Sequence, residues 1–202
     1  MREKKKRAKR CEITREKVIC AAFDELRENG TEKWNARTIA RRAGCSTMPL
    51  FRLFKNMEEI REEVIARAEG VYESYINEGL KEPLAYRGAG RAYIRFAREE
   101  PQLFKALCVS EEFTGRPFSA IDSTLPKVMR VAERTGDVCG EKAKRLHACM
   151  TIFCHGAGVM EASDALMVPK DAIEPLMSDV FRALKEYYKI LPDETETGEE
   201  EK

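Results

Sequence analysis

The 202-residue sequence has few of the features that mark a secreted, membrane-bound or disulfide-stabilised protein. Its longest stretch without a charged side chain, Leu146–Met160, has 15 residues, which is too short for a helix that spans a bilayer. No apolar run follows the basic residues at the start, as it would in a secretory signal. We therefore expect a cytoplasmic protein with no membrane partner.

Cysteine chemistry has little support in the sequence. The seven cysteines are odd in number and none occurs in a Cys-x-x-Cys pair, so neither a disulfide framework nor a zinc ribbon is expected. His147, Cys149, Cys154 and His155 are close in sequence, but on a helix they do not share one face within the reach of a single tetrahedral metal ion. We expect no metal and no cofactor.

Signals for strands and for catalysis are also missing. The chain has no sustained alternation of apolar and polar residues, which favours an all-α fold. It has no glycine-rich phosphate loop after a strand, no nucleophile–base spacing and no paired carboxylates on an apolar face. These absences argue against an enzyme.

Charge is abundant and unevenly distributed. Residues 1–55 carry 16 basic and 7 acidic side chains, whereas the remaining 147 residues carry 20 basic and 28 acidic ones. Seven basic residues lie in 1–10, which we interpret as a basic arm, and five Glu and one Asp lie in 193–202, an acidic tail. A basic N-terminal part predicts contact with a polyanion at that end only.

Capping residues divide the N-terminal quarter into three short helices. Thr14 and Asn35 are the predicted N-caps of the first two helices, Gly30 and Gly44 end them, and a third helix starts after Ser46. The tight turn between the second and third helices is typical of a helix-turn-helix. The side chains expected to be buried on these helices are Ile19, Ala22, Leu26, Ile39, Ala40, Ala43, Leu50 and Phe54.

Apolar residues at helical spacing continue after this quarter. A long helix is predicted over 57–79, with a buried stripe of Met57, Ile60, Val64, Ala68, Val71 and Tyr75. The elements expected next are, in order, a helix between Pro83 and Pro101, a short helix over 102–109, a loop over 111–117 and a helix over 118–135 that bends near Pro126.

Two further helices are predicted towards the end of the chain. The first, over 141–165, is expected to be buried on most sides because its middle is uncharged in every direction. The second follows Pro169 and carries apolar residues at alternating spacings of four and three, which form a packing seam. Because this apolar surface exceeds what one chain can cover, we expect a homodimer that forms a four-helix bundle. The residues expected to hold it together are Ile173, Met177, Val180, Leu184 and Tyr187.

Three segments resemble the TetR-type transcriptional regulators. They are Thr14–Gly30 (TREKVICAAFDELRENG), Ala36–Ser46 (ARTIARRAGCS) and Leu50–Ile60 (LFRLFKNMEEI), and Ala92–Ala97 and Phe153–Gly156 look like parts of one subtype of the family's C-terminal domain. The resemblance implies an all-α protein with a helix-turn-helix DNA-binding domain over 1–56. A helical ligand-binding and dimerisation domain over 57–192 would follow.

The third helix is the expected recognition helix. Side chains that point away from Leu50 and Phe54 would meet the major groove, and Arg52 suits a bidentate contact with guanine. The resemblance adds Arg37, which matches a family position that often contacts a base or a phosphate. The expected DNA-binding residues are Asn35, Arg37, Thr38, Ser46, Thr47, Met48, Pro49, Phe51, Arg52, Leu53 and Lys55.

Two residues depart from the family pattern. Phe51 stands where the family usually has Tyr, and Met57 where it usually has Lys. The family residues bind phosphates, one through a hydroxyl and one through a charge, so two anchors are missing. Lys55, Asn56 and the basic arm are the candidates to replace them.

Methionines and aromatic residues after position 57 predict a cavity for a small, largely apolar molecule. The residues expected to line this cavity are Tyr93, Phe96, Phe104, Met129, Met150, Thr151, Phe153 and His155. Tyr93, His147, Thr151 or His155 would orient a polar end of the ligand.

The sequence therefore predicts a sequence-specific transcriptional regulator. We expect a homodimer that binds a palindromic double-stranded operator as a repressor and is released by a small apolar effector. Two alternatives stay open. In the first, the chain is a helical adaptor; in the second, it is a regulator that responds to a metal or to redox state without a small organic ligand.

Overall fold

A computed structural model of the chain describes residues 13–191, so the predicted basic arm and acidic tail lie outside the described residues. Within 13–191 every regular element is a helix, which confirms the all-α prediction. None of the helices in this range is long and apolar enough to cross a membrane.

The chain divides into two compact units, Met1–Ala68 and Glu69–Lys202. The division falls inside the long helix α4 (Met57–Gly79), whose two ends agree with the sequence prediction. The first half of α4 therefore belongs to the N-terminal unit, whereas the sequence analysis assigned the whole helix to the second domain.

The N-terminal unit contains three short helices before α4: α1 (Arg15–Asn29), α2 (Ala36–Ala43) and α3 (Thr47–Leu53). They begin and end where the capping residues predict. The Thr14 hydroxyl accepts a hydrogen bond from the Lys17 amide at 3.2 Å, and the Asn35 side chain caps α2 in a capping box with Thr38. Gly44 ends α2 with φ of 74°, a left-handed conformation that favours glycine.

Apolar side chains of these four helices form the core of the N-terminal unit. Every side chain that the sequence analysis expected to be buried on α1 to α3 is at most 4% exposed. Two contacts that it did not anticipate fix α2 against α1. The buried Trp34 indole donates a hydrogen bond to the Ala22 carbonyl at 2.9 Å, and Arg42 Nε lies 2.7 Å from the buried Glu25 carboxylate.

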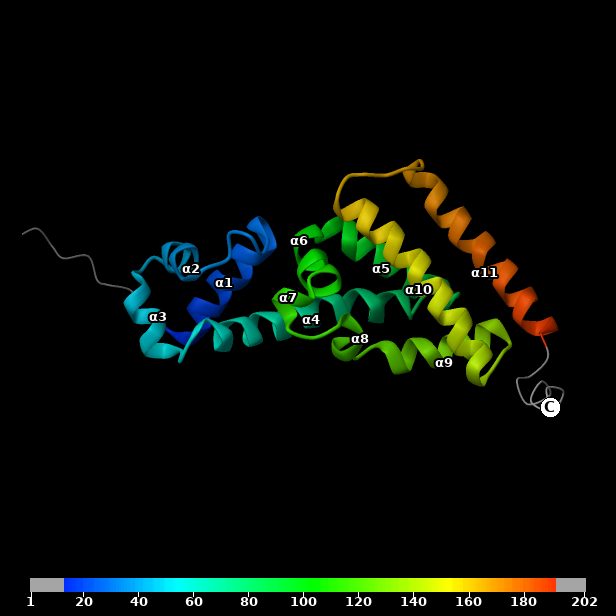
Figure 1. The fold of residues 1–202 in the computed structure, drawn as a ribbon, viewed down its shortest axis with the longest axis horizontal. Coiled ribbons are helices and arrows are strands. Elements are labelled where there is room, and N and C mark those ends of the chain that lie inside the picture. The colour runs from blue at the N-terminus through cyan, green and yellow to red at the C-terminus, as the bar shows by residue number, and fades with distance from the viewer. Residues whose placement is uncertain (1–12, 192–202) are drawn as a thin grey trace, which may run out of the picture. The chain divides into compact units, whose positions relative to one another are not determined.

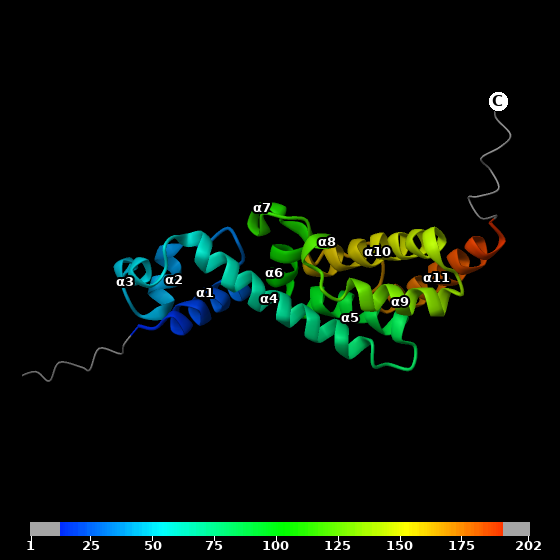
Figure 2. The ribbon, with the colours of Figure 1, turned by 90° about the horizontal axis from the view of Figure 1, so that it is seen from below.

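The C-terminal unit contains the second half of α4 and the remaining helices. These are α5 (Ala85–Glu99), α6 (Pro101–Phe104), the π-helical turn η1 (Lys105–Val109), α7 (Glu111–Thr114), α8 (Phe118–Ile121), α9 (Leu125–Gly136), α10 (Gly140–Ala162), the 3₁₀ turn η2 (Lys170–Ala172) and α11 (Ile173–Ile190). Helix α10 is central to this unit, because it packs against α5, α9 and α11 (Figures 1 and 2).

Two predictions for the segment between α6 and α10 are wrong. The expected loop over 111–117 contains the one-turn helix α7, because the Ser110 hydroxyl caps it and Phe113 is buried beneath it. The expected single helix over 118–135 is two helices, α8 and α9. The Asp122 carboxylate accepts hydrogen bonds from the Thr124 amide and hydroxyl, which satisfies the backbone at the start of α9 and separates it from α8.

Two faces also differ from their predictions. On α4 the buried side chains after Ala68 are those of Tyr72 and Ile76, whereas Val71 and Tyr75 are half-buried. Helix α10 is buried along one side only, and Ile152 on its other side is 73% exposed. The neighbouring helices of the same chain cover only part of its circumference. The lack of charge around α10 therefore does not mean that the helix is buried on all sides within one copy of the chain.

Candidate functional site

The exposed surface of α2 and α3 is the first candidate site. Leu50 and Phe54 are at most 2% exposed and hold α3 on the core of the N-terminal unit. The opposite side of α3 is unusually apolar for a solvent-facing surface, since Met48 is 65% and Phe51 47% exposed. Arg52 extends from the same side and donates a hydrogen bond to the Met48 sulfur at 3.7 Å.

Most of the predicted DNA-binding side chains reach the surface. Those that are exposed are Asn35, Arg37, Ser46, Met48, Phe51, Arg52 and Lys55, and those that are half-buried are Thr38, Thr47, Pro49 and Leu53. The polar groups of Asn35 and Thr38 are already engaged in capping α2. Asn35 Oδ1 accepts from the Arg37 and Thr38 amides at 3.0 and 3.2 Å, and the Thr38 hydroxyl lies 2.8 Å from the Lys33 carbonyl.

Six arginines within residues 13–68 fall into two groups. Arg15, Arg42 and Arg67 form ion pairs with carboxylates of the same unit, so they hold its helices together. Arg37, Arg41 and Arg52 are exposed, and no carboxylate of residues 13–68 is paired with them. Arg41 lies one turn after Arg37 on α2, and the sequence analysis did not single it out. Unpaired guanidinium groups are the ones free to bind an anion.

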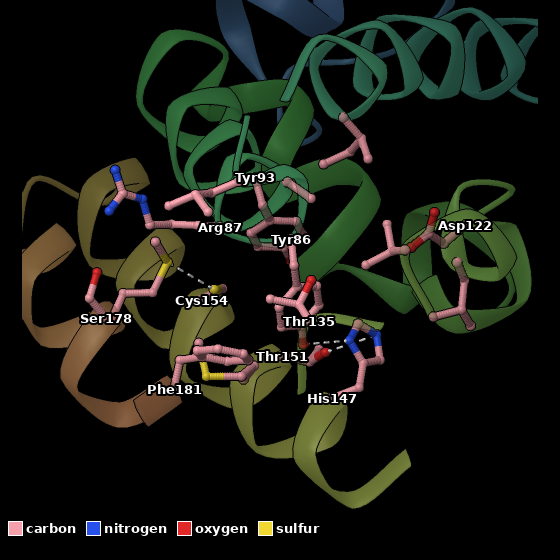
Figure 3. A pocket seen from close by; sticks show the side chains of 18 of the residues that line it. Tyr86, Arg87, Tyr93, Asp122, Thr135, His147, Thr151, Cys154, Ser178 and Phe181 are labelled. Carbon is pink, nitrogen blue, oxygen red and sulfur yellow. Dashed lines mark hydrogen bonds between the residues drawn. The ribbon is translucent and has the colours of Figure 1, made fainter. Parts of the chain in front are cut away.

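The second candidate site is a cavity of about 720 Å³ inside the C-terminal unit. Its wall is built by α4, α5, α8, α9, α10 and α11 and consists mainly of apolar and aromatic side chains. Figure 3 shows Tyr86 and Tyr93 in the middle of this wall, with Asp122 at one end and Arg87 and Ser178 at the other. A cavity of this size and composition is typical of a site for a small organic molecule.

Three of the predicted ligand-binding residues, Tyr93, Met150 and Thr151, line the cavity. The other five do not: Phe96, Phe104, Met129, Phe153 and His155. Phe96 and Phe104 are fully buried, with ring centroids 6.2 Å apart, and they pack behind the wall rather than in it. Helical spacing identifies an apolar face but cannot tell which part of that face remains uncovered by its neighbours.

Two tyrosine–histidine hydrogen bonds join α5 to α10 beside the cavity. The Tyr86 hydroxyl lies 3.0 Å from Nδ1 of His147, and the Tyr93 hydroxyl lies 2.9 Å from Nδ1 of His155. Burial lowers the pKa of His147, against the opposing effect of the Asp122 carboxylate, and burial also lowers the pKa of His155. Both imidazoles are therefore neutral near pH 7, and Nδ1 of each can accept a hydrogen bond from the tyrosine hydroxyl.

Several residues of the cavity wall were not predicted from the sequence, among them Tyr72, Tyr86, Phe118 and Asp122. Tyr72 could have been found, because it continues the four-residue spacing of Ile60, Val64 and Ala68. Nothing in the sequence marks Asp122, since its place in the wall depends on the break between α8 and α9.

The residues predicted to form the dimer do not share one surface. Ile173 and Met177 are at most 4% exposed and pack inside the chain, and Met177 lines the cavity. Val180 and Leu184 are half-buried, and Tyr187 is 54% exposed. A different seam of α11 faces solvent, and its residues are Leu176, Val180, Ala183, Tyr187 and Ile190. Their spacing of four, three, four and three is that of a helix-packing seam.

The described residues offer no evident metal centre. Within 13–191 no group of three or more His, Cys, Asp or Glu side chains is arranged to hold a metal ion. Burial raises the pKa of the Cys154 thiol to about 12, so this cysteine is a poor nucleophile and packs as an apolar side chain.

Comparison with known proteins gives a likeness of fold. No family model and no curated protein sequence matches the chain. Among solved structures, a TetR-like transcriptional regulator from Rhodococcus sp. RHA1 is 15% identical and matches 83% of this chain and 92% of its own length, with a TM-score of 0.62. A TetR variant from Acinetobacter baumannii AYE in complex with minocycline is 16% identical, with coverages of 88% and 97% and a TM-score of 0.48. The chain has the fold of the TetR-like transcriptional regulators.

Proposed function

We propose that the chain is a sequence-specific DNA-binding regulator of transcription that reads the major groove with α3. The observation that carries the proposal is the division of α3 into two sides. Leu50 and Phe54 anchor it on the core, while Met48, Phe51 and Arg52 are exposed, with no partner surface among residues 13–68. A helix held by one face and preceded by a tight turn is the arrangement that inserts into a major groove. The fold likeness supports the same function.

The charges of this surface fit a DNA duplex. Within residues 13–191 no carboxylate is paired with Arg37 or Arg41 on α2 or with Arg52 on α3, so these arginines can bind phosphates or a base edge without breaking an ion pair. Met48 and Phe51 offer apolar contacts, for which the thymine methyl group is the matching feature of the groove. We infer that each half-site contains a guanine for Arg52 beside one or more thymines.

Selection of binding sites from random double-stranded DNA tests this proposal. The selected site is then measured with wild-type protein, with Arg52→Ala and with Arg130→Ala, a control that removes an exposed arginine of the C-terminal unit. We expect Arg52→Ala to lose about 1–3 kcal/mol per half-site and to relax the preference at one base pair. Arg130→Ala should bind as the wild type does. Failure to select any sequence, or unchanged affinity and preference in Arg52→Ala, would contradict the proposal.

We infer further that the protein acts as a homodimer. Helix α11 exposes the seam that contains Leu176, Tyr187 and Ile190, and α10 exposes Ile152. Large apolar side chains that face solvent along two adjacent helices are typical of an interface between copies. Pairing of two copies through these helices would give a four-helix bundle, and its two-fold symmetry would require an operator with two matching half-sites.

We also propose that a small molecule in the cavity lowers the affinity for DNA, so that the protein acts as a releasable repressor. The cavity wall includes Tyr72 and Ile76 of α4, and the first half of the same helix carries Ile60 and Val64 in the core of the N-terminal unit. A ligand that changes the position of α4 would therefore act on a helix that both units share. It must bind the DNA-incompetent state more tightly, and a preference of about 1.4 kcal/mol gives tenfold release.

A further inference from the structure

Among residues 13–191 the carboxylate of Asp122 is the one acidic group in the wall of the cavity, and its hydrogen bonds come from neutral donors. Oδ1 accepts from the Thr124 amide at 2.9 Å and from the Thr124 hydroxyl at 2.6 Å, and Oδ2 accepts from the Tyr72 hydroxyl at 3.2 Å. Among the ion pairs of residues 13–191 none includes Asp122. Within the described residues the negative charge at the cavity therefore has no paired cation, and Oδ2, which accepts one hydrogen bond, can accept another.

Aromatic rings of the cavity wall cluster around Tyr72, the residue that donates a hydrogen bond to Asp122. Phe118 packs edge-on against Tyr72 and Tyr93, with ring centroids 5.2 and 6.3 Å apart, and Tyr72 packs edge-on against Tyr93 at 6.2 Å. All three side chains line the cavity together with Asp122. Aromatic faces attract a positive charge within about 6 Å of the ring, most strongly where water is excluded. The rings and the carboxylate thus favour the same kind of group.

Arg87 lies at the other end of the cavity (Figure 3), and both arginines of the cavity wall, Arg87 and Arg182, are already paired. Arg87 lies 3.5 Å from Glu174, and Arg182 forms an ion pair with Asp179. Arg182 is also largely exposed, so water competes for its charge. The arginine end therefore offers a weaker attraction for an anion than the Asp122 end offers for a cation.

We propose that the ligand of this cavity is a hydrophobic organic cation whose positive group is held by Asp122 among the rings of Tyr72, Tyr93 and Phe118. The inference rests on the proposed function because it names the chemical class of the molecule that occupies the same cavity. The apolar part of the cation would extend along Tyr86 towards Arg87. The carboxylate supplies the charge that the ligand needs in an otherwise apolar site, which offsets the cost of taking the cation out of water.

Three probes of similar size and different charge test the proposal. They are trimethyl(4-phenylbutyl)ammonium as the cation, 5-phenylpentan-1-ol as the neutral molecule and 5-phenylpentanoate as the anion. Each is titrated calorimetrically into the full-length protein without DNA. We expect the cation to bind at least about tenfold more tightly than either other probe, since a partly buried opposite charge contributes on the order of a tenfold preference.

Asp122→Asn removes the charge and keeps an acceptor for the Thr124 amide. We expect this variant to lose the preference for the cation and to bind the alcohol within about threefold of wild type. Asp164→Asn, which removes an exposed carboxylate outside the cavity wall, should keep the preference. Phe118→Leu keeps an apolar side chain and removes a ring face, so it should weaken binding of the cation more than binding of the alcohol. Melting curves of each variant verify that the comparison is made on folded protein.

The outcomes separate this inference from the proposed function. No binding of the cation, binding no tighter than that of the alcohol, or a preference that persists in Asp122→Asn would overturn the assignment of a cation and leave DNA recognition by α3 untouched. Should Asp122→Asn prove unfolded, a preference unchanged in Phe118→Leu would overturn it. Cation binding that depends on Asp122 in a protein that selects no DNA sequence would support this inference and contradict the proposed function.

Discussion

The backbone of Gly158 lies against the ring of Phe104, so closely that a Cβ at position 158 would stand 2.9 Å from Cζ of that ring. Phe104 is fully buried, and its ring also packs edge-on against Tyr93, with centroids 5.6 Å apart. The contact between α10 and α6 therefore depends on the missing side chain. Glycine here serves close packing rather than a special backbone angle, because it lies inside a regular helix.

We predict that Gly158→Ala destabilises the protein by about 1–3 kcal/mol, because the buried ring cannot move aside without disturbing its neighbours. Gly70→Ala is the matched control. Gly70 also lies inside a helix, but a Cβ there would meet no atom within 4 Å, so this variant should be more stable by about 0.5–1 kcal/mol. Urea unfolding of both variants measures the difference, and two changes of the same sign would contradict the packing argument.

The stability of the protein should fall as the pH drops below about 6.5. His147 and His155 are the only histidines in the chain, and burial lowers the pKa of both in the folded protein. The unfolded chain therefore takes up protons at a higher pH than the folded one, which lowers the free energy of unfolding between the unfolded and folded pKa values. Above pH 6.5 this contribution is fully present. Urea unfolding between pH 5 and 8 should show the decline, and a His147→Gln/His155→Gln variant should show a flatter profile.

The double variant Ile152→Glu/Tyr187→Glu should be monomeric at micromolar concentration. Both side chains are more than half exposed in one copy, so the charges should not disturb its fold, whereas in a dimer they would be buried opposite each other. Met167→Glu is the control, since Met167 is 90% exposed and lies in the loop between α10 and η2. Sedimentation velocity distinguishes the results. A wild-type protein that sediments as a monomer would contradict the dimer itself.

Restoring the phosphate anchors of the resembling family should strengthen DNA binding in two distinguishable ways. Phe51→Tyr adds a neutral hydroxyl at an exposed position, so affinity should rise by about 0.5–1.5 kcal/mol with an unchanged salt dependence. Met57→Lys adds a charge, so the slope of log affinity against log salt should steepen by about 0.9 for each half-site bound. Fluorescence anisotropy at several salt concentrations measures the affinity and its salt dependence for both variants. If neither change raised the affinity, the DNA phosphates would not lie beside positions 51 and 57.

Replacing thymine by uracil in a selected binding site tests the apolar surface of α3. The change removes only the 5-methyl group, and we expect a loss of about 1 kcal/mol at positions that contact Met48 or Phe51. A Met48→Ala variant should be less sensitive to the same replacement. Equal affinity for the thymine and uracil sites in the wild type would show that these side chains do not contact the methyl groups.

The ends of α1 and α2 could be predicted from the sequence because capping is local. Thr14, Gly30, Asn35 and Gly44 stop or start a helix through bonds to residues at most four positions away, and the structure places the ends of α1 and α2 at these residues. The core of the N-terminal unit followed for the same reason, since α1 to α3 are short and each presents one apolar face.

The cavity wall and the exposed surface of α11 could not be predicted in full, because they depend on which helices pack against each other. The sequence placed Phe96 and Phe104 in the cavity wall and Ile173 and Met177 on the dimer surface, but all four side chains are buried within the chain. Helical periodicity identifies the apolar face of a helix. It does not say whether that face packs against a neighbouring helix, lines a cavity or contacts a second copy of the chain.

The sequence by itself determined the helices of the N-terminal unit, the caps of α1 and α2 and the two-sided α3, because these depend on hydrogen bonds and spacings within a few residues. Only the tertiary structure decided that Asp122 and Tyr72, 50 positions apart, share a hydrogen bond at the end of a cavity. That contact requires α8 to end at Ile121 and α4 to turn Tyr72 inwards. Both depend on packing between distant segments, where burial of apolar surface outweighs the local preference of any one residue.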